Sequence, residues 1–170
     1  MPADKRVKDL MKDIFEFPHI PYWFTIRQAI GIIKSAGLEK APHQIVVLVF
    51  EEKYHLVGTL GIKDILRGLE PVYLRTSSQH EHSAQEGDMA LSLVWDTMFD
   101  MSNKELLQKQ VSDILYPIEH FAGTDDHLAK AVYVMLTNDL FLLPVLEDKR
   151  KLVGIVTLLD IFNELSSPVA

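Results

Sequence analysis

A duplicated segment constrains the fold of this chain more than any other feature of its sequence. Residues 151–162 read as a short apolar strand followed by a helix with an aspartate in its first turn, and residues 56–66 repeat that order. Glycine and aspartate keep their register in both copies, since 154 − 58 and 160 − 64 each give 96. The chain is therefore built from one unit used twice, and each copy ends in a strand-to-helix corner with a carboxylate: Asp64 in the first copy and Asp160 in the second.

The first copy reads as an extended segment, a helix, two strands and a second helix. Prolines make residues 17–23 extended. Apolar residues at helical spacing predict a helix over residues 25–34. Residues 45–50 are largely β-branched and continuously apolar, which is typical of a strand buried on both faces. A second strand over residues 55–60 and a helix over residues 61–69 complete the copy.

The second copy repeats this order after the lead-in 111–115. A helix over residues 126–138, strands over 140–146 and 152–156, and a helix over 158–165 are predicted. A two-stranded unit cannot bury both of its faces alone, so we expect the two copies to pack strand to strand with the helices outside. The predicted fold is α/β, with two β-α-β-β-α repeats that form one intramolecular pseudo-dimer.

The predicted domain organisation is repeat 1 over residues 1–69, an insertion over 70–110, and repeat 2 over 111–166. Within the insertion, the polar residues 75–88 are expected to form a long surface loop. Residues 89–100 have apolar side chains at helical spacing and predict an inserted helix.

Two groups in the insertion allow alternative interpretations. Trp95 and Phe99 form an i, i+4 pair that either packs on the core or covers a homodimer or partner surface. His80 and His82 have the spacing of a zinc-binding pair, but no third histidine follows at a suitable distance. In a loop rich in Ser, Gln and Gly we expect this pair to be solvated, so no metal site is predicted and a metal-dependent enzyme ranks last.

The composition is that of a globular protein with neither a membrane span nor a secretory signal. The longest apolar runs, residues 45–50 and 140–146, are much shorter than the roughly 18 residues of a membrane helix. The absence of cysteine excludes disulfides and is typical of a reducing compartment, so a cytoplasmic protein is expected. The net charge of −7 argues against binding to nucleic acid. Since no catalytic motif stands out, no enzymatic activity is predicted.

The repeat resembles a tandem pair of CBS (cystathionine β-synthase) domains, known as a Bateman module. The resemblance covers roughly residues 3–69 and 111–165. It implies a regulatory module that binds an adenosine-containing ligand (AMP, ADP, ATP or S-adenosylmethionine) in the clefts between the copies, without an obligatory cofactor. It also implies a homodimer that acts on an unknown regulated protein. The motifs that carry the resemblance are Leu143-Pro144-Val145-Leu146, an acidic turn, Leu152-Val153-Gly154-Ile155-Val156-Thr157, Asp160-Ile161 and Val111-Ser112-Asp113-Ile114-Leu115.

The chemistry of the second corner suits such a ligand. A carboxylate can accept hydrogen bonds from both hydroxyls of a ribose, and Asp160 provides one in the first turn of its helix. The unpaired N–H groups of that turn favour phosphate oxygens, and Thr157 adds a hydroxyl. The resemblance implies two walls of an apolar slot for the base: Leu140, Phe141 and Pro144 on one side and His120 on the other.

Each of these residues also has a purely structural interpretation. Thr157 and Asp160 match a helix-capping pattern, and an aspartate in a first turn stabilises the helix dipole by roughly 0.3–1 kcal/mol. Phe141 and Pro144 also suit a hydrophobic core, and His120 a solvated surface. The alternative function is therefore a ligand-free dimerisation or protein-interaction module.

The first copy departs from the pattern. Asp64 remains, but Gly61 stands where the second copy has Thr157, and Leu48 stands where it has Pro144. We therefore predict an impaired or empty first site and occupancy mainly at the second.

Overall fold

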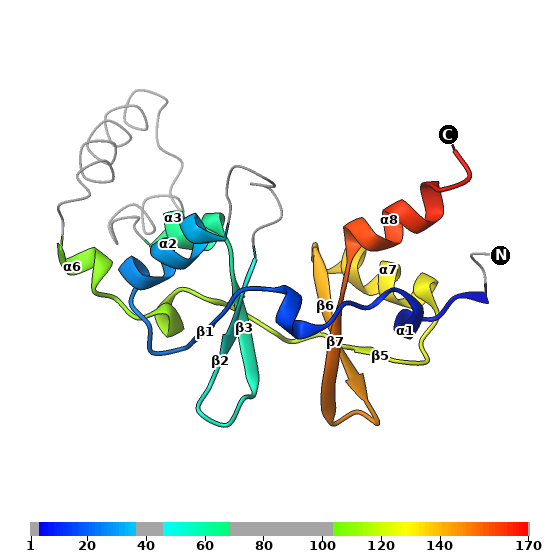
Figure 1. The fold of residues 1–170 in the computed structure, drawn as a ribbon, viewed down its shortest axis with the longest axis horizontal. Coiled ribbons are helices and arrows are strands. Elements are labelled where there is room, and N and C mark those ends of the chain that lie inside the picture. Colours follow the sequence, from blue (N-terminus) through cyan, green and yellow to red (C-terminus); the bar gives the residue numbers. More distant parts are fainter. Residues whose placement is uncertain (1–3, 37–45, 69–103, 170) are drawn as a thin grey trace, which may run out of the picture. The chain divides into compact units, whose positions relative to one another are not determined.

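The computed structural model describes residues 4–36, 46–68 and 104–169, which divide into two units. Pro18–Pro117 form the repeat-1 unit, and Met1–Phe17 together with Ile118–Ala170 form the repeat-2 unit. Each unit has its own sheet (Figure 1). Each unit also has its own cluster of buried hydrophobic residues. The expected inserted helix with Trp95 and Phe99, and the His80 and His82 pair, lie outside the described residues.

The sheet of the repeat-1 unit has four strands in chain order. β1 is parallel to β2, whereas β2 with β3 and β3 with β4 are antiparallel. The strands are β1 (His19–Pro21), β2 (Val47–Phe50), β3 (Leu56–Leu60) and β4 (Tyr116–Pro117). The helices are α2 (Ile26–Ser35), α3 (Ile62–Gly68), α6 (Lys104–Leu107) and the 3-10 helix η4 (Val111–Asp113).

The repeat-2 unit has the same plan with a three-stranded sheet in the order β5-β6-β7. β5 is parallel to β6, and β6 is antiparallel to β7. The strands are β5 (Ala122–Gly123), β6 (Leu142–Glu147) and β7 (Lys151–Thr157). The helices are α1 (Val7–Leu10), the 3-10 helix η2 (Ile14–Glu16), α7 (Leu128–Thr137) and α8 (Leu158–Ser166).

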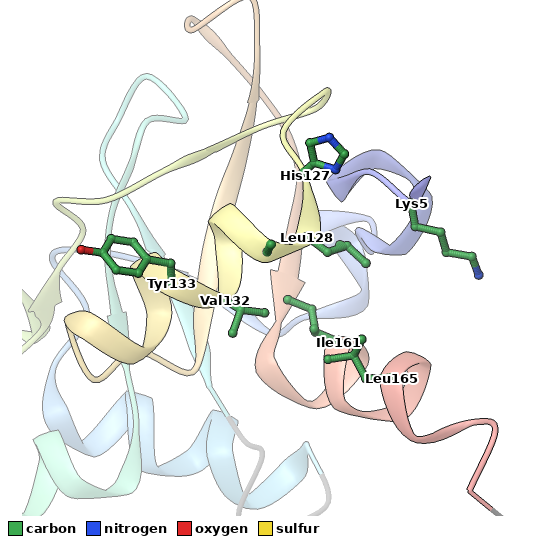
Figure 2. Close-up of a pocket in the computed structure, with 8 residues that line it drawn as sticks. Lys5, His127, Leu128, Val132, Tyr133, Ile161 and Leu165 are labelled. Carbon is green, nitrogen blue, oxygen red and sulfur yellow. The ribbon is translucent and has the colours of Figure 1, made fainter. Parts of the chain in front are cut away.

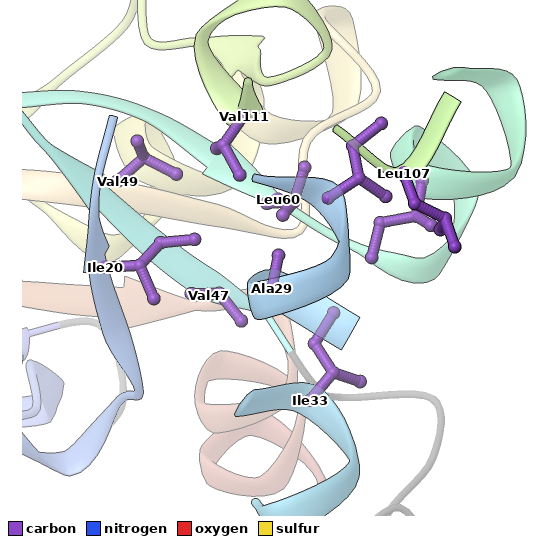
Figure 3. Packing of buried hydrophobic residues seen from close by; sticks show 10 residues of the cluster. Ile20, Ala29, Ile33, Val47, Val49, Leu60, Leu107 and Val111 are labelled. Carbon is purple, nitrogen blue, oxygen red and sulfur yellow. The ribbon is translucent and has the colours of Figure 1, made fainter. Parts of the chain in front are cut away.

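The cores explain why the central strands have continuous apolar sequences. Val47, Leu48 and Val49 of β2 are all fully buried, as expected of a strand covered on both faces. Figure 3 shows Val47 and Val49 beside residues from β1, β3 and α2. In the repeat-2 unit, Leu143 and Val145 of β6 pack with residues of β7, α7 and α8 in the same manner.

One predicted boundary was wrong, because the strand expected at Leu140 begins at Leu142. The N–H of Leu140 donates to the Met135 carbonyl at the end of α7 (2.8 Å), so it closes the helix and is not available to a strand. Asp139, with φ of 54°, turns the chain before it. Leu140 and Phe141 therefore lie in the turn between α7 and β6.

The lead-in of each repeat, which in the structure spans residues 4–12 for repeat 1 and 111–116 for repeat 2, packs in the unit of the other repeat. Val7, from the first lead-in, is fully buried in the core of the repeat-2 unit. Val111, from the second lead-in, is fully buried in the core of the repeat-1 unit. The predicted boundaries 1–69, 70–110 and 111–166 describe the repeat in the sequence and stay a prediction, whereas the packing units exchange their first segments.

The exchange keeps the register of the duplication. Lys12 pairs with Ile155 of β7, and Tyr116 pairs with Thr59 of β3. The lead-in partners differ by 116 − 12 = 104 positions and the strand partners by 155 − 59 = 96, the same offset that separates the repeated glycines and aspartates. The two units therefore contain the same cross-connection twice.

The repeated glycine is required at this cross-connection. A Cβ atom on Gly154 would lie 2.8 Å from the backbone oxygen of Lys12, and one on Gly58 would lie 2.7 Å from the backbone oxygen of Tyr116. Both distances are below any ordinary contact of a Cβ atom, so a side chain here would push the lead-in away from the strand. The in-register glycines are thus explained by the close approach of the exchanged segments.

Candidate functional site

The strand-to-helix corner of the repeat-2 unit fixes the carboxylate of Asp160. Thr157 is the N-cap of α8, and its Oγ1 accepts a hydrogen bond from the Asp160 N–H (3.1 Å). The same hydroxyl donates to Asp160 Oδ2 over 2.5 Å. Only 12% of the Asp160 side chain is exposed. The threonine therefore caps the helix and orients the carboxylate at the helix entrance.

A cation that no sequence motif indicates lies beside this carboxylate. The Nζ atom of Lys12 is 3.1 Å from Asp160 Oδ1. An ionised carboxylate has roughly four lone-pair sites, and in the free protein Thr157 and Lys12 use two of them. No motif or spacing in the sequence joins Lys12 to the corner, because the contact depends on the exchange of the lead-ins.

The predicted slot residues belong to the same unit as Asp160 but differ in exposure. Pro144 is buried within β6, opposite Ile155 of β7, and Leu140 and His120 are half-buried. Phe141 is 75% exposed, and its carbonyl accepts a hydrogen bond from the N–H of Leu158, the first residue of α8 (2.7 Å). The backbone of Phe141 thus joins the corner directly, and its ring is free of the core.

Pro144 changes the edge of the sheet beside β5. In the repeat-1 unit, the N–H of the corresponding Leu48 donates to the carbonyl of Pro18 (2.8 Å), and strand pairing begins at His19 opposite Leu48. A proline has no N–H and cannot make that bond. Pairing in the repeat-2 unit begins one position later, at Ala122 opposite Val145.

The corner of the repeat-1 unit uses its carboxylate in a different way. Asp64 Oδ2 accepts a hydrogen bond from the N–H of Gly61 (2.8 Å), so the aspartate itself caps the start of α3. Arg67, one turn further along α3, has its guanidinium 4.0 Å from Asp64 Oδ1. The position that corresponds to Lys12 is Tyr116, which has no positive charge.

An apolar hollow of about 400 Å³ lies between α7 and α8. Figure 2 shows residues of both helices facing it, with Lys5 beside them. Lys5 forms an ion pair with Glu164 of α8. The lining does not include Thr157 or Asp160, so the hollow is not part of the corner. Its lining residues are Lys5, His127, Leu128, Ala129, Val132, Tyr133, Ile161 and Leu165.

The described ranges 4–36, 46–68 and 104–169 offer neither a metal-binding cluster nor a membrane span. In these ranges no three His, Asp or Glu side chains gather in a way that could hold a metal ion. The same ranges contain no helix with the length and apolar character needed to cross a membrane.

The second repeat matches a known family. The family model of the CBS domain matches residues 111–167, which include β6, β7 and the corner of α8. Residues 111–167 form a CBS domain. No curated protein matches the sequence.

Solved structures with CBS domains share the fold over almost the whole chain. A CBS domain-containing protein of unknown function from Bacillus anthracis gives a TM-score of 0.67 at 18% identity, with 98% of this chain and 96% of that chain covered. CBSX2 in complex with AMP gives 0.62 at 16% identity, covering 97% and 98%. The cytosolic domain of the Mg²⁺ channel MgtE in complex with ATP gives 0.59 at 19% identity, covering 95% and 49%.

These comparisons confirm the prediction of an α/β chain made of CBS-type repeats. The family model covers the second repeat, and the structural likeness extends the fold to the first. At identities below 20% the likeness shows the fold alone. The chain spans about half the length of the MgtE structure.

Proposed function

We propose that this protein is a regulatory module that binds an adenosine-containing ligand at the Thr157 and Asp160 corner. The observation that carries the proposal is the carboxylate of Asp160, which is oriented at the entrance of α8 by the Thr157 hydroxyl. Two solved structures with this fold are complexes with AMP and with ATP, which supports an adenine nucleotide as the ligand. We propose a regulatory and not an enzymatic role. The protein would act in the cytoplasm and would need no obligatory cofactor.

The proposed roles follow from the chemistry of each group. Asp160 accepts hydrogen bonds from the two ribose hydroxyls, and the Thr157 hydroxyl with the N–H groups of the first turn of α8 receives phosphate oxygens. Phe141 and Pro144 contact one face of the base, and His120 contacts the other. The missing N–H of Pro144 leaves the backbone before β5 free to bind the edge of the base.

The corner of the repeat-1 unit is proposed to be empty or weak. Its carboxylate is occupied in capping, because Asp64 bonds the Gly61 N–H. A ribose would have to compete with that bond, and no hydroxyl is present at position 61 to replace it. We therefore expect one bound ligand for each chain.

Isothermal titration with ATP, AMP and S-adenosylmethionine tests the proposal on wild type, Asp160→Ala and Asp64→Ala. Loss of a charge-assisted pair of hydrogen bonds costs about 1.5–3 kcal/mol, which weakens binding roughly 10- to 100-fold in Asp160→Ala. Asp64→Ala should bind as wild type does. Unchanged affinity in Asp160→Ala would remove the assignment, and binding lost equally in both variants would show a general effect on the fold.

A second candidate function is self-association through α7 and α8. The side chains of Tyr133, Leu136, Phe162 and Leu165 on these helices are more than half exposed, and exposed apolar groups of this size favour an interface. We propose that they cover the corresponding face of a second copy, which would make the protein a homodimer able to present itself to a regulated protein. Sedimentation of Phe162→Glu should show less dimer than wild type at equal concentration, whereas Tyr54→Glu, on an exposed turn, should not. Monomeric wild type at every concentration would exclude this candidate.

A further inference from the structure

We propose that Lys12 makes the Asp160 corner select phosphorylated ligands over neutral and cationic ones. The inference rests on the proposed function and narrows its ligand class to nucleotides, excluding S-adenosylmethionine. In the free protein Lys12 is paired with Asp160. When the ribose hydroxyls of a nucleotide bind the Asp160 carboxylate, a phosphate of the same nucleotide forms an ion pair with the Lys12 ammonium.

The backbone holds Lys12 at the corner independently of its charge. Its N–H donates to the Ile155 carbonyl (2.7 Å), and its carbonyl accepts from the Ile155 N–H (2.9 Å). Gly154 permits this approach, since a side chain there would collide with the Lys12 carbonyl. The side chain is 46% exposed, so its ammonium can turn from Asp160 to a ligand without a change in the lead-in.

The electrostatics distinguish the ligands that share an adenosine group. Because Asp160 is largely buried, separating its carboxylate from the Lys12 ammonium costs free energy unless the ligand compensates for the lost ion pair. A nucleotide supplies a phosphate that forms a charge-assisted bond with the Lys12 ammonium. Adenosine supplies no anion, and S-adenosylmethionine places a sulfonium close to the ribose, which the ammonium repels. The corner of the repeat-1 unit has Tyr116 at this position, and the cation beside its carboxylate is Arg67 of α3.

Lys12→Met tests the proposal because it removes the charge and keeps the apolar stem. Titrations with ATP, AMP, adenosine and S-adenosylmethionine are compared for wild type, Lys12→Met and Lys12→Arg. Loss of the charge-assisted bond should weaken the binding of ATP and AMP about tenfold in Lys12→Met, while the binding of adenosine and of S-adenosylmethionine is unchanged or tighter. Lys12→Arg should keep the preference for nucleotides.

Lys8→Met is the matched control. Lys8 belongs to the same lead-in, but its ammonium pairs with Asp125 (2.8 Å) and not with the corner. This variant should bind all four compounds as wild type does, which shows that a lost lysine in the lead-in has no general effect. Melting curves of each variant verify that the fold is kept.

The wild type supplies a test that needs no variant. It should bind ATP at least about tenfold more tightly than adenosine at low salt, and this ratio should fall as salt screens the lysine. If Lys12→Met lost affinity for ATP and adenosine equally, Lys12 would have a structural role. If it lost affinity for neither, Lys12 would not contact the ligand. Either result would overturn this inference and leave the proposed function standing. Wild type that binds none of the four compounds would overturn the proposed function and this inference with it.

Discussion

The Asp160 and Asp64 corners have the same backbone plan but use their carboxylates for different purposes. At the start of α8 the hydroxyl of Thr157 caps the helix and holds the carboxylate from the side. At the start of α3 there is no hydroxyl, and Asp64 bonds the backbone N–H of Gly61. An aspartate in the same register is therefore available to a ligand only where another group has taken over the capping.

The second difference comes from the exchanged lead-ins. The lead-in of repeat 1 brings Lys12 to the corner of α8, and that of repeat 2 brings Tyr116 alongside β3. The cation beside Asp160 thus comes from the other repeat, whereas the cation beside Asp64 is Arg67 of the same repeat. Since the surrounding frame is the same, the two corners can be compared one residue at a time.

The largest effect is expected from the glycine that admits the lead-in. Gly154→Ala places a Cβ atom 2.8 Å from the Lys12 carbonyl, a backbone atom that cannot turn away. Overpacking of this kind costs about 2–3 kcal/mol, so the free energy of unfolding should fall by that amount in urea denaturation. Gly58→Ala should behave alike, because its Cβ atom would meet the Tyr116 carbonyl at 2.7 Å.

Gly31→Ala is the control for these two substitutions. No atom lies within 4 Å of the position that a Cβ atom would take at Gly31, and the residue is in the middle of α2. Alanine should therefore stabilise the protein by about 0.5–1 kcal/mol through helix propensity. If Gly154→Ala proved as harmless as this control, the close approach would not explain the repeated glycine.

Replacing Pro144 should have opposite effects on stability and on binding. Pro144→Leu restores the N–H that Leu48 provides in the repeat-1 unit, where a buried leucine is accommodated at this position. One regained hydrogen bond should add about 1 kcal/mol to the free energy of unfolding. The extended ladder would occupy the backbone proposed to bind the base, so ATP affinity should fall about tenfold, or about 1.4 kcal/mol. A stabilised variant with unchanged affinity would separate Pro144 from the site.

Most secondary structure in these corners could be predicted from the sequence, because it depends on neighbours in the chain. Helical spacing located α2 and α8, and the β-branched run at 45–50 located β2. The capping role of Thr157 followed from its position before an apolar helix. The site residue Asp160 was selected from its register and from a family resemblance, and its role stays a prediction.

The contacts that distinguish the corners could not be predicted in this way. Lys12 meets Asp160 only because the lead-ins exchange units, and such long-range packing leaves no periodic pattern in the sequence. The late start of β6 was missed for a related reason, since the Leu140 N–H has two possible partners and in the structure it bonds the end of α7. The glycine register was visible in the sequence, but its cause was not.

A smaller effect is expected in the turn before α7. Thr25 caps α2 with its hydroxyl, whereas His127, the N-cap of α7, makes no side-chain capping bond. The turn before α7 is instead held by Asp126, which accepts from the Gly123 N–H and pairs with Lys130. Burial raises the pKa of the Asp126 carboxyl, but the Gly123 hydrogen bond and the Lys130 ammonium outweigh it, so the net pKa is lowered.

Because the folded pKa of Asp126 lies below the unfolded one, this carboxylate stabilises the fold above a pH of about 3.9 and loses that effect as pH falls through the folded pKa. Asp126→Asn should therefore cost about 1 kcal/mol or less at pH 7. The difference from wild type in urea denaturation should shrink as the pH falls below about 4 and through the lowered pKa of Asp126. A difference that stayed constant would show that shape, and not charge, is responsible.

The smallest effect on stability is expected from giving the repeat-1 corner the missing hydroxyl. The added Cβ of Gly61→Thr would have ordinary contact with Asp64 Oδ2 at 3.6 Å, so the backbone leaves room for a Cβ atom. A threonine in place of glycine as N-cap should add only a few tenths of a kcal/mol. The new hydroxyl should nevertheless release Asp64 from the Gly61 N–H. We still expect this corner to bind no nucleotide, because Tyr116 supplies no cation at the position of Lys12 and Arg67 reaches Asp64 from α3 instead. Adding Tyr116→Lys should then raise the titrated stoichiometry above one per chain. If Gly61→Thr alone created a second nucleotide site, the hydroxyl would be sufficient for nucleotide binding. Lys12 would then not explain the difference between the two corners.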